Sequence, residues 1–294
     1  MRNKSDMDTL SDIFFDIYKK AQISGQIYQV EDFKSKNILF FNGEYSYIHI
    51  FQGSNFNVQC DELKMNEELN DGEVLVIPSR VKHSIEIIDN KKSDFSVITC
   101  IFQLQGAYGS MIAEGLPKYI LVPINPIGKV AEWVPMTVAA IKLELGNPTL
   151  GSQVMISSII DLLLVWSIRF WLSKATEMHK SWILALSNPS LSRAIFLMHT
   201  KPAQNWTVEV LAKETHQSKS KFSKNFNELV GTSPINYLKN WRMKLAVKYL
   251  TESNNTVSQV AELVGYSSQA AFTRAFVQTF GCSPKKFLEH SINK

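Results

Sequence analysis

The chain has 294 residues, enough for two domains, and with 45% apolar and 20% charged residues its composition excludes a disordered or fibrous protein. Its three cysteines, Cys60, Cys100 and Cys282, are widely spaced and form no CxxC, which excludes a disulfide framework and a cysteine zinc site and fits a reducing cytosol. The net charge of +4 is unevenly distributed: residues 1–180 carry 17 Lys and Arg against 21 Asp and Glu, whereas residues 181–294 carry 14 against 6. A basic half of this kind points to an acidic polymer as partner. The N-terminus has no apolar signal region, so we expect a cytoplasmic protein.

Residues 38–104 are expected to form short β-strands. Stretches such as YSYIHIFQG, GEVLVIPS and FSVITCIFQL are rich in Ile, Val, Phe and Tyr, and Gly, Asp, Asn and Pro separate them. Regular short strands divided by turns indicate a sandwich or barrel.

Helices are expected after residue 106, over Ala131–Leu145 and Ser152–Ser173. The most apolar stretch, Met155–Trp171, contains Asp161 and Arg169 and is short for a span of about 20 residues, which favours a buried or interface helix over a membrane span. A membrane-tethered protein stays open as a lesser alternative.

The basic half contains a repeat, Thr207–Leu238 and Thr256–Leu288, and each copy reads as helix, short turn, helix. Phe222 and Phe226 in the first copy match Phe272 and Phe276 in the second, and Gly-x-Ser-Pro follows each pair. The i, i+4 phenylalanines predict a buried face. This is the pattern of two helix-turn-helix motifs, in which the second helix of each enters a DNA major groove.

The face opposite the phenylalanines carries the candidate DNA-reading residues. At about 100° per residue, Lys224 lies about 200° from Phe222 and therefore points outward. Arg274 takes the same position in the second copy. These are residue types that recognise base edges. The candidate set is Ser220, Ser223, Lys224, Asn227, Gln269, Ala270, Thr273 and Arg274.

The segment between the copies predicts one helix of about 18 residues, about 27 Å long. Its apolar stripe is Leu238, Trp241, Leu245, Ala246 and Tyr249. Such a helix can hold two recognition helices roughly one duplex turn, about 34 Å, apart. Four basic residues lie along this helix, some expected at phosphates and most solvated: Lys239, Arg242, Lys244 and Lys248.

At these motifs the chain resembles a known family. WTVEVLAKE, SKFSKNFNELVGTSPINYLKNWRMKLA and VAELVGYSSQAAFTRAFVQTFGCSP make residues 190–290 similar to the DNA-binding domain of AraC/XylS transcriptional regulators. The resemblance implies recognition helices at Lys219–Val230 and Ser268–Phe280. It departs at His216, where the family usually has glycine.

Residues 8–172 resemble the cupin-like sensor domain of an AraC subfamily through YSYIHIFQGS, LNDGEVLVIPSRVKHSI and GLPKYILV. His49 and His83 fall where cupin motifs place histidines, but the remaining ligands of a metal cupin are absent, so we expect no metal, no cofactor and no enzyme. A metal-cupin enzyme fused to a DNA-binding domain stays the lesser alternative. A second alternative is a thiol-based redox regulator that uses Cys100, which otherwise reads as a small buried residue.

Together these observations predict an α+β protein of two domains. Residues 1–180 would form a cupin-like β-barrel for effector sensing, followed by helices that the resemblance assigns to dimerisation. The apolar residues expected at that interface are Leu162, Leu163, Val165, Trp166 and Phe170. Residues 181–294 would form an all-α domain with two helix-turn-helix motifs joined by a long helix. The expected partners are double-stranded DNA over two successive major grooves, a second copy of the chain, RNA polymerase, and an effector of unknown chemistry sensed through His49, His83 or Cys100. The expected function is transcriptional regulation. The resemblance implies activation, the family's common mode, although the residues are equally compatible with repression.

Overall fold

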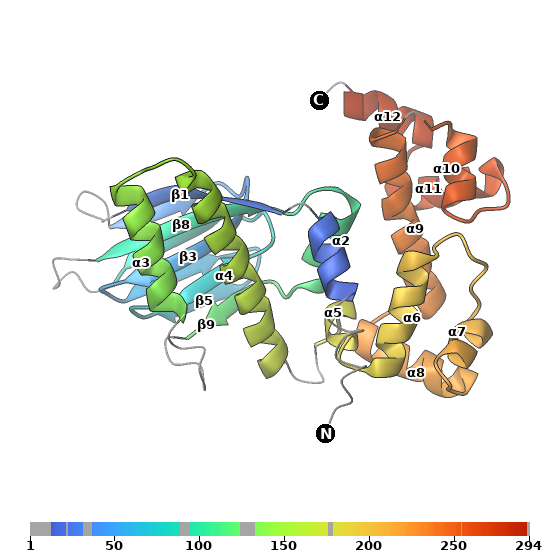
Figure 1. The fold of residues 1–294 in the computed structure, drawn as a ribbon, viewed down its shortest axis with the longest axis horizontal. Helices are drawn as coiled ribbons and strands as arrows, with labels where there is room; N and C mark the ends of the chain where they lie inside the picture. Colours follow the sequence, from blue (N-terminus) through green and yellow to red (C-terminus); the bar gives the residue numbers. More distant parts are fainter. Residues whose placement is uncertain are drawn as a thin grey trace. The chain divides into compact units, whose positions relative to one another are not determined.

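The structure is a computed structural model, and it describes residues 13–21, 23–31, 37–88, 95–123, 133–175, 179–253 and 255–292. The N-terminal half contains two antiparallel sheets and the C-terminal half is helical, which confirms the expected α+β class (Figure 1). The chain divides into two compact units.

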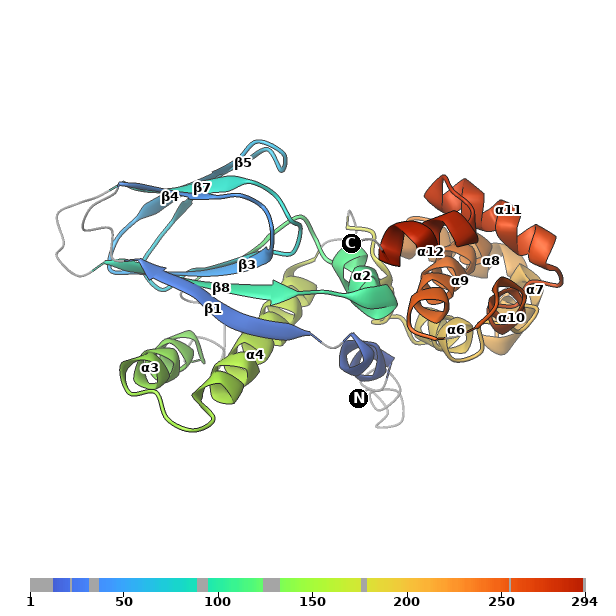
Figure 2. The ribbon, with the colours of Figure 1, turned by 90° about the horizontal axis from the view of Figure 1, so that it is seen from above.

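The first sheet has five strands in the order β1-β8-β3-β6-β9, and the second has four in the order β2-β7-β4-β5. Their bounds are Ser24–Glu31 (β1), Ile38–Phe41 (β2), Ser46–Gln52 (β3), Phe56–Cys60 (β4), Met65–Leu69 (β5), Val74–Ile77 (β6), His83–Ile87 (β7), Ser96–Gln103 (β8) and Ile120–Val122 (β9). The two sheets face each other in Figure 2, and their apolar side chains form one core that includes Tyr47, Phe51, Phe56, Val58 and Ile85.

Two strands lie outside the segment in which the sequence predicted strands. β1 pairs with β8 and alternates between exposed and half-buried residues, and β9 pairs with β6 through three residues only. Both are edge strands, so their pairing partners stabilise them more than any local run of apolar residues does.

Two helices cover the outer face of the five-stranded sheet: α3 (Trp133–Gly146) and α4 (Ser152–Lys174) (Figure 2). They begin and end within two residues of the predicted helices; the first two residues of the predicted Ala131–Leu145 lie outside the described part. α4 buries Ile156, Ile160, Leu163, Leu164 and Ile168 and contacts β1. Gly25 of β1 is needed for this approach, because a Cβ there would lie 2.3 Å from Cγ2 of Ile160.

The helices of the other unit are α2 (Gly106–Gly115), α5 (Trp182–Ala185), α6 (Pro189–Thr200), α7 (Val208–Glu214), α8 (Lys219–Val230), α9 (Pro234–Thr251), α10 (Val257–Leu263), α11 (Gln269–Phe280) and α12 (Pro284–Ile292). Residues 13–20 are also helical. The Asn188 side chain caps α6, and Thr256 forms a capping box with Gln259 at the start of α10.

Helix α2 follows β8 in the chain yet packs with the C-terminal helices, so the two compact units interleave in sequence. They comprise residues 22–104 with 116–175, and residues 1–21 with 105–115 and 176–294. The indole N–H of Trp182 donates to the Met111 carbonyl at 2.9 Å, and the Tyr108 and Trp241 rings lie 5.1 Å apart. The sequence predicted one boundary, between residues 180 and 181, and did not predict that residues 105–115 belong to the C-terminal unit.

Candidate nucleic-acid interface

The first helix pair consists of α7, a short turn and α8. The Thr207 hydroxyl accepts the Val210 N–H at the start of α7, and the Ser218 hydroxyl accepts the Lys221 N–H at the start of α8. Between them the Gln217 N–H donates to the Ala212 carbonyl at 2.9 Å, and His216 has a φ of 54°. The chain therefore reverses through one residue in the left-handed region.

The second pair, α10 and α11, has the same plan. The Tyr266 N–H donates to the Ala261 carbonyl at 2.9 Å, Gly265 has a φ of 82°, and the Ser268 hydroxyl caps α11. His216 thus occupies the backbone position that glycine occupies in the second turn. Histidine is one of the few residues that visit this region, at a cost glycine does not have.

Both second helices bury their phenylalanines. Phe222, Phe226, Phe272 and Phe276 are fully buried, and within each helix the two rings lie 5.8 and 5.6 Å apart. The prediction that these side chains face the core is confirmed. The periodicity of the helix then places the opposite face in solvent.

The structure places the eight candidate DNA-reading residues on these solvent faces. Six are exposed and two are half-buried. The exposed six are Ser220, Lys224, Asn227, Gln269, Ala270 and Arg274; the half-buried two are Ser223 and Thr273. Their contact with DNA stays a prediction. Ser268 itself precedes α11 as its cap, so the second predicted recognition helix begins one residue later.

The two faces differ in how far their polar groups are already engaged. Lys224 Nζ lies 3.9 Å from a carboxylate oxygen of Glu228, and the Asn227 amide donates to the Ser223 carbonyl at 3.0 Å. Within the described ranges, no ion pair involves Arg274. Exposed pairs of this kind contribute little and are easily exchanged for a phosphate or a base.

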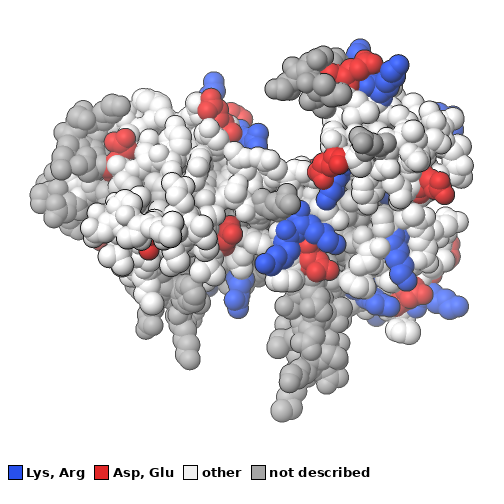
Figure 3. Space-filling view, turned by 45° about the horizontal axis from the view of Figure 1, so that its top comes forward, with Lys and Arg blue, Asp and Glu red and all other residues white. Residues whose placement is uncertain are grey.

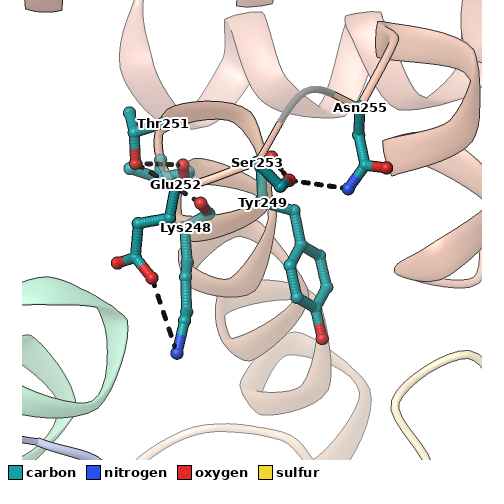
Figure 4. Close-up of polar contacts among 7 residues, drawn as sticks. Lys248, Tyr249, Thr251, Glu252, Ser253 and Asn255 are labelled. Atoms are coloured by element: carbon teal, nitrogen blue, oxygen red, sulfur yellow. Dashed lines mark hydrogen bonds and ion pairs between the residues drawn. The ribbon is translucent and has the colours of Figure 1, made fainter.

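Sequence reasoning missed how the basic residues of the long helix α9 are used. Each has a partner inside this unit: Lys239 donates to the Gln278 side chain, Arg242 to two backbone carbonyls, Lys244 pairs with Glu114, and Lys248 pairs with Glu252 (Figure 4). On the face drawn in Figure 3, basic and acidic side chains are interspersed. On the second helices, by contrast, Lys221 and Arg274 are exposed, and within the described ranges neither takes part in an ion pair.

In the N-terminal unit the structure brings His49 and His83 together across the two sheets. Their Nε2 atoms lie 2.9 Å apart. His83 Nδ1 lies 3.1 Å from the Val81 carbonyl, which can only accept, so this nitrogen carries a proton. Burial lowers the pKa of both rings, well below the ordinary value for His49, so both are neutral at pH 7. The His49 Nε2–H then donates to His83, and the Thr99 hydroxyl donates to His49 Nδ1 at 3.0 Å.

Over the part of the chain that the structure describes, no group of three His, Cys, Asp or Glu side chains could hold a metal ion. The ring nitrogens of His49 and His83 that would face a metal are hydrogen-bonded to each other instead. An open pocket of about 560 Å³ adjoins His83 and is lined by residues that include Phe40, Phe41, Gln59, Asp61 and Lys82.

Cys100 is fully buried in β8, and burial raises its pKa to about 12. A thiol of this kind stays protonated at neutral pH and is a poor nucleophile. Cys60 is also buried and unpaired. Both observations speak against the thiol-switch alternative.

Helix α4 is the one described helix that is long and apolar enough to cross a membrane, a test that core helices of other proteins also pass. It lies along β1, but apolar side chains of the α3–α4 hairpin remain exposed, among them Met136, Leu143, Leu150, Val154 and Leu162. Of the residues expected at a dimer interface, Leu163 is buried, whereas Val165, Trp166 and Phe170 are half-buried.

Two protein families match the chain. A helix-turn-helix domain matches residues 211–290, and a cupin domain matches residues 47–173. Among curated proteins, the chain is 33% identical to the HTH-type transcriptional regulator AlkR of Acinetobacter baylyi over 62% of this chain and 60% of the relative. It is 30% identical to a putative AraC-like transcription regulator of Streptomyces lividans over 61% and 59%. It is 28% identical to the RCS-specific HTH-type transcriptional activator RclR of Escherichia coli over 75% and 76%. The matches to the first two relatives thus span about three fifths of their length.

Proposed function

We propose that this chain is an AraC/XylS-type transcriptional regulator, which binds specific DNA sequences and regulates transcription in response to a signal sensed by its cupin domain. The observation that supports this most strongly is the repeated helix pair: two turns with matching hydrogen bonds, each followed by a capped helix with a polar outer face. Packing of a helix against a core does not by itself require this arrangement of turn, cap and polar face to occur twice.

The two pairs are proposed to act as helix-turn-helix motifs joined by α9, with α8 and α11 in successive major grooves. Arg274 and Lys224 suit guanine, and Gln269 suits adenine. The hydroxyls of Ser220, Ser223 and Thr273 can serve several bases, and the Ala270 methyl suits thymine. Asn227 is the weakest member of this set, because its amide already donates to its own helix.

The exposed apolar side chains of α3 and α4 support a homodimer, in which two copies cover a surface that water otherwise contacts. We propose that this chain acts as an activator and that RNA polymerase is its protein partner. The proposed location is the cytoplasm. A small effector is proposed to bind in the pocket beside His83, where it would shift the populations of DNA-binding states.

The experiment is a salt titration of the full-length protein with genomic DNA fragments, in the presence of excess unrelated competitor. We expect the logarithm of the affinity to fall linearly and steeply with the logarithm of salt concentration, with some fragments retained against the competitor. A flat salt dependence with no fragment preferred would contradict the proposal.

A further inference from the structure

One arginine in the middle of α9 connects the α9 helix to the loop that leads into the first helix pair. Arg242 Nε donates to the Pro202 carbonyl at 2.8 Å, and Nη2 donates to the Gln204 carbonyl at 2.9 Å. Both carbonyls belong to the connection between α6 and α7. The planar guanidinium can reach two acceptors at once, which a lysine ammonium on a flexible stem does not reproduce.

The loop that Arg242 holds is itself well fixed. The indole N–H of Trp206 donates to the Lys201 carbonyl at 2.9 Å, and the Trp206 backbone N–H donates to the Gln204 carbonyl at 2.8 Å. Trp206 is buried, and the next residue, Thr207, caps α7. A displacement of the loop would therefore be transmitted to the first pair.

The same guanidinium also touches the turn of the second pair. Its Cζ lies 5.9 Å from the centre of the Tyr266 ring, and that ring contacts Phe272 of α11 at 5.6 Å. A Cβ on Gly265 would lie 2.8 Å from Arg242 Nη2 and 2.7 Å from Ala203 Cα. The loop of the first pair, the arginine and the turn of the second pair thus meet at one point.

We propose that Arg242 is a positioning residue that fixes the separation and orientation of α8 relative to α11, and so the spacing of the two DNA segments that one chain can bind together. This inference rests on the proposed DNA-binding function. Two linked binding elements gain affinity only when their geometry permits simultaneous engagement. An arginine that ties both elements together without standing on either outer face can set that geometry.

The rival explanation is that Arg242 contacts a DNA phosphate directly. The two predict different patterns. Loss of a phosphate contact weakens binding to every duplex by the same factor and reduces the salt slope by about one. Loss of a positioning contact weakens only those duplexes that engage both helix pairs.

The experiment compares the full-length wild type with Arg242→Lys and with Arg193→Lys as matched control. Arg193 is an exposed arginine on α6 whose guanidinium lies over Phe196. Four duplexes are titrated by fluorescence anisotropy at two salt concentrations: the two-segment site selected by the wild type, two versions with one segment scrambled, and one with a base pair inserted between the segments.

We expect R242K to bind the intact site about tenfold more weakly than the wild type. It should bind each single-segment duplex with the same affinity as the wild type. The inserted base pair should reduce its affinity less than it reduces that of the wild type. R193K should match the wild type throughout. Equal weakening on all four duplexes, or wild-type affinity on all four, would overturn the positioning role. Circular dichroism verifies folding, and if R242K unfolds, Arg242→Gln is titrated and interpreted by the same criteria. A failure of the proposed function is separate, because the wild type would then select no two-segment site.

Discussion

The first helix pair, α7–α8, and the second, α10–α11, share a backbone plan but rest on different side chains. Beneath α8, Phe226 contacts Tyr237, whose hydroxyl bonds to His199 at 2.9 Å, and His199 stacks on Trp241. Beneath α11, Phe276 contacts Phe280 and Phe287. Phe226 of the first pair thus contacts a tyrosine that bonds to a buried histidine, whereas Phe276 of the second pair contacts phenylalanine rings, so the two pairs share a backbone plan but not the same supporting side chains.

The turns and outer faces differ in the same way. The first turn has His216 where the second has Gly265, and the first outer face has an ion-paired Lys224 where the second has Arg274. Because the two motifs otherwise share one plan, substitutions in the first and the second are expected to differ in their effects on stability or DNA affinity.

The largest effect is expected from Gly265→Ala. The new Cβ would lie 2.7 Å from Ala203 Cα at a φ of 82°, so both a steric clash and left-handed strain apply, and we expect a loss of about 2–4 kcal/mol in unfolding free energy. Gly281→Ala is the control: it has a φ of 74° with open space around it and should lose only about 1–2 kcal/mol. Urea denaturation measures both, and equal losses would contradict the close approach at the second turn.

The next effect concerns DNA affinity. Arg274→Ala should weaken binding to the cognate site by about 1–3 kcal/mol and relax the preference at one base pair. Lys224→Ala should cost less, because a lysine lacks the planar fork and this one exchanges an existing ion pair for its DNA contact. Anisotropy titrations at one salt concentration compare them. A larger loss for Lys224 would reverse the proposed ranking of the two faces.

An intermediate effect is expected from acidification. Burial, with a contribution from Lys20, lowers the pKa of His199 from 6.5 to about 3. The unfolded chain then binds the extra proton below pH 6.5, so stability falls as pH decreases through 6.5, by about 1.4 kcal/mol per pH unit from this group. Urea denaturation at pH 7.5 and 5.5 should show that His199→Gln reduces the acid-induced loss by about 1 kcal/mol. An unchanged pH dependence would mean that His199 is protonated in the folded state.

The smallest effect is expected from His216→Gly. Relief of left-handed strain at φ 54° is partly offset by the greater freedom of glycine in the unfolded chain, which leaves a gain of about 0–1 kcal/mol. Thermal unfolding should therefore show a small rise in midpoint. A marked fall would indicate that the His216 side chain makes a stabilising contact of its own.

The sequence was most informative where structure is set locally. The phenylalanine pairs and the glycines after α8 and α11 act over three to five residues, so their spacing was sufficient to predict both helix pairs. The outer faces followed from helical periodicity alone.

The features that could not be predicted depend on partners far along the chain. Helix α2 has glycines at both ends and is held by Trp182, 71 residues after Met111. The partners of Arg242 are 38 and 40 residues away, so it looked like any solvated basic residue. The His49–His83 bond crosses two sheets and could be expected only through the cupin resemblance.

The most direct test of two motifs with one role is selection of bound duplexes from random DNA by the full-length protein, followed by the same selection with Arg274→Ala. We expect the wild type to enrich two conserved segments about 10 base pairs apart, and the variant to lose preference within one of them only. A single conserved segment in the wild type, or a variant with an unchanged preference, would contradict the account.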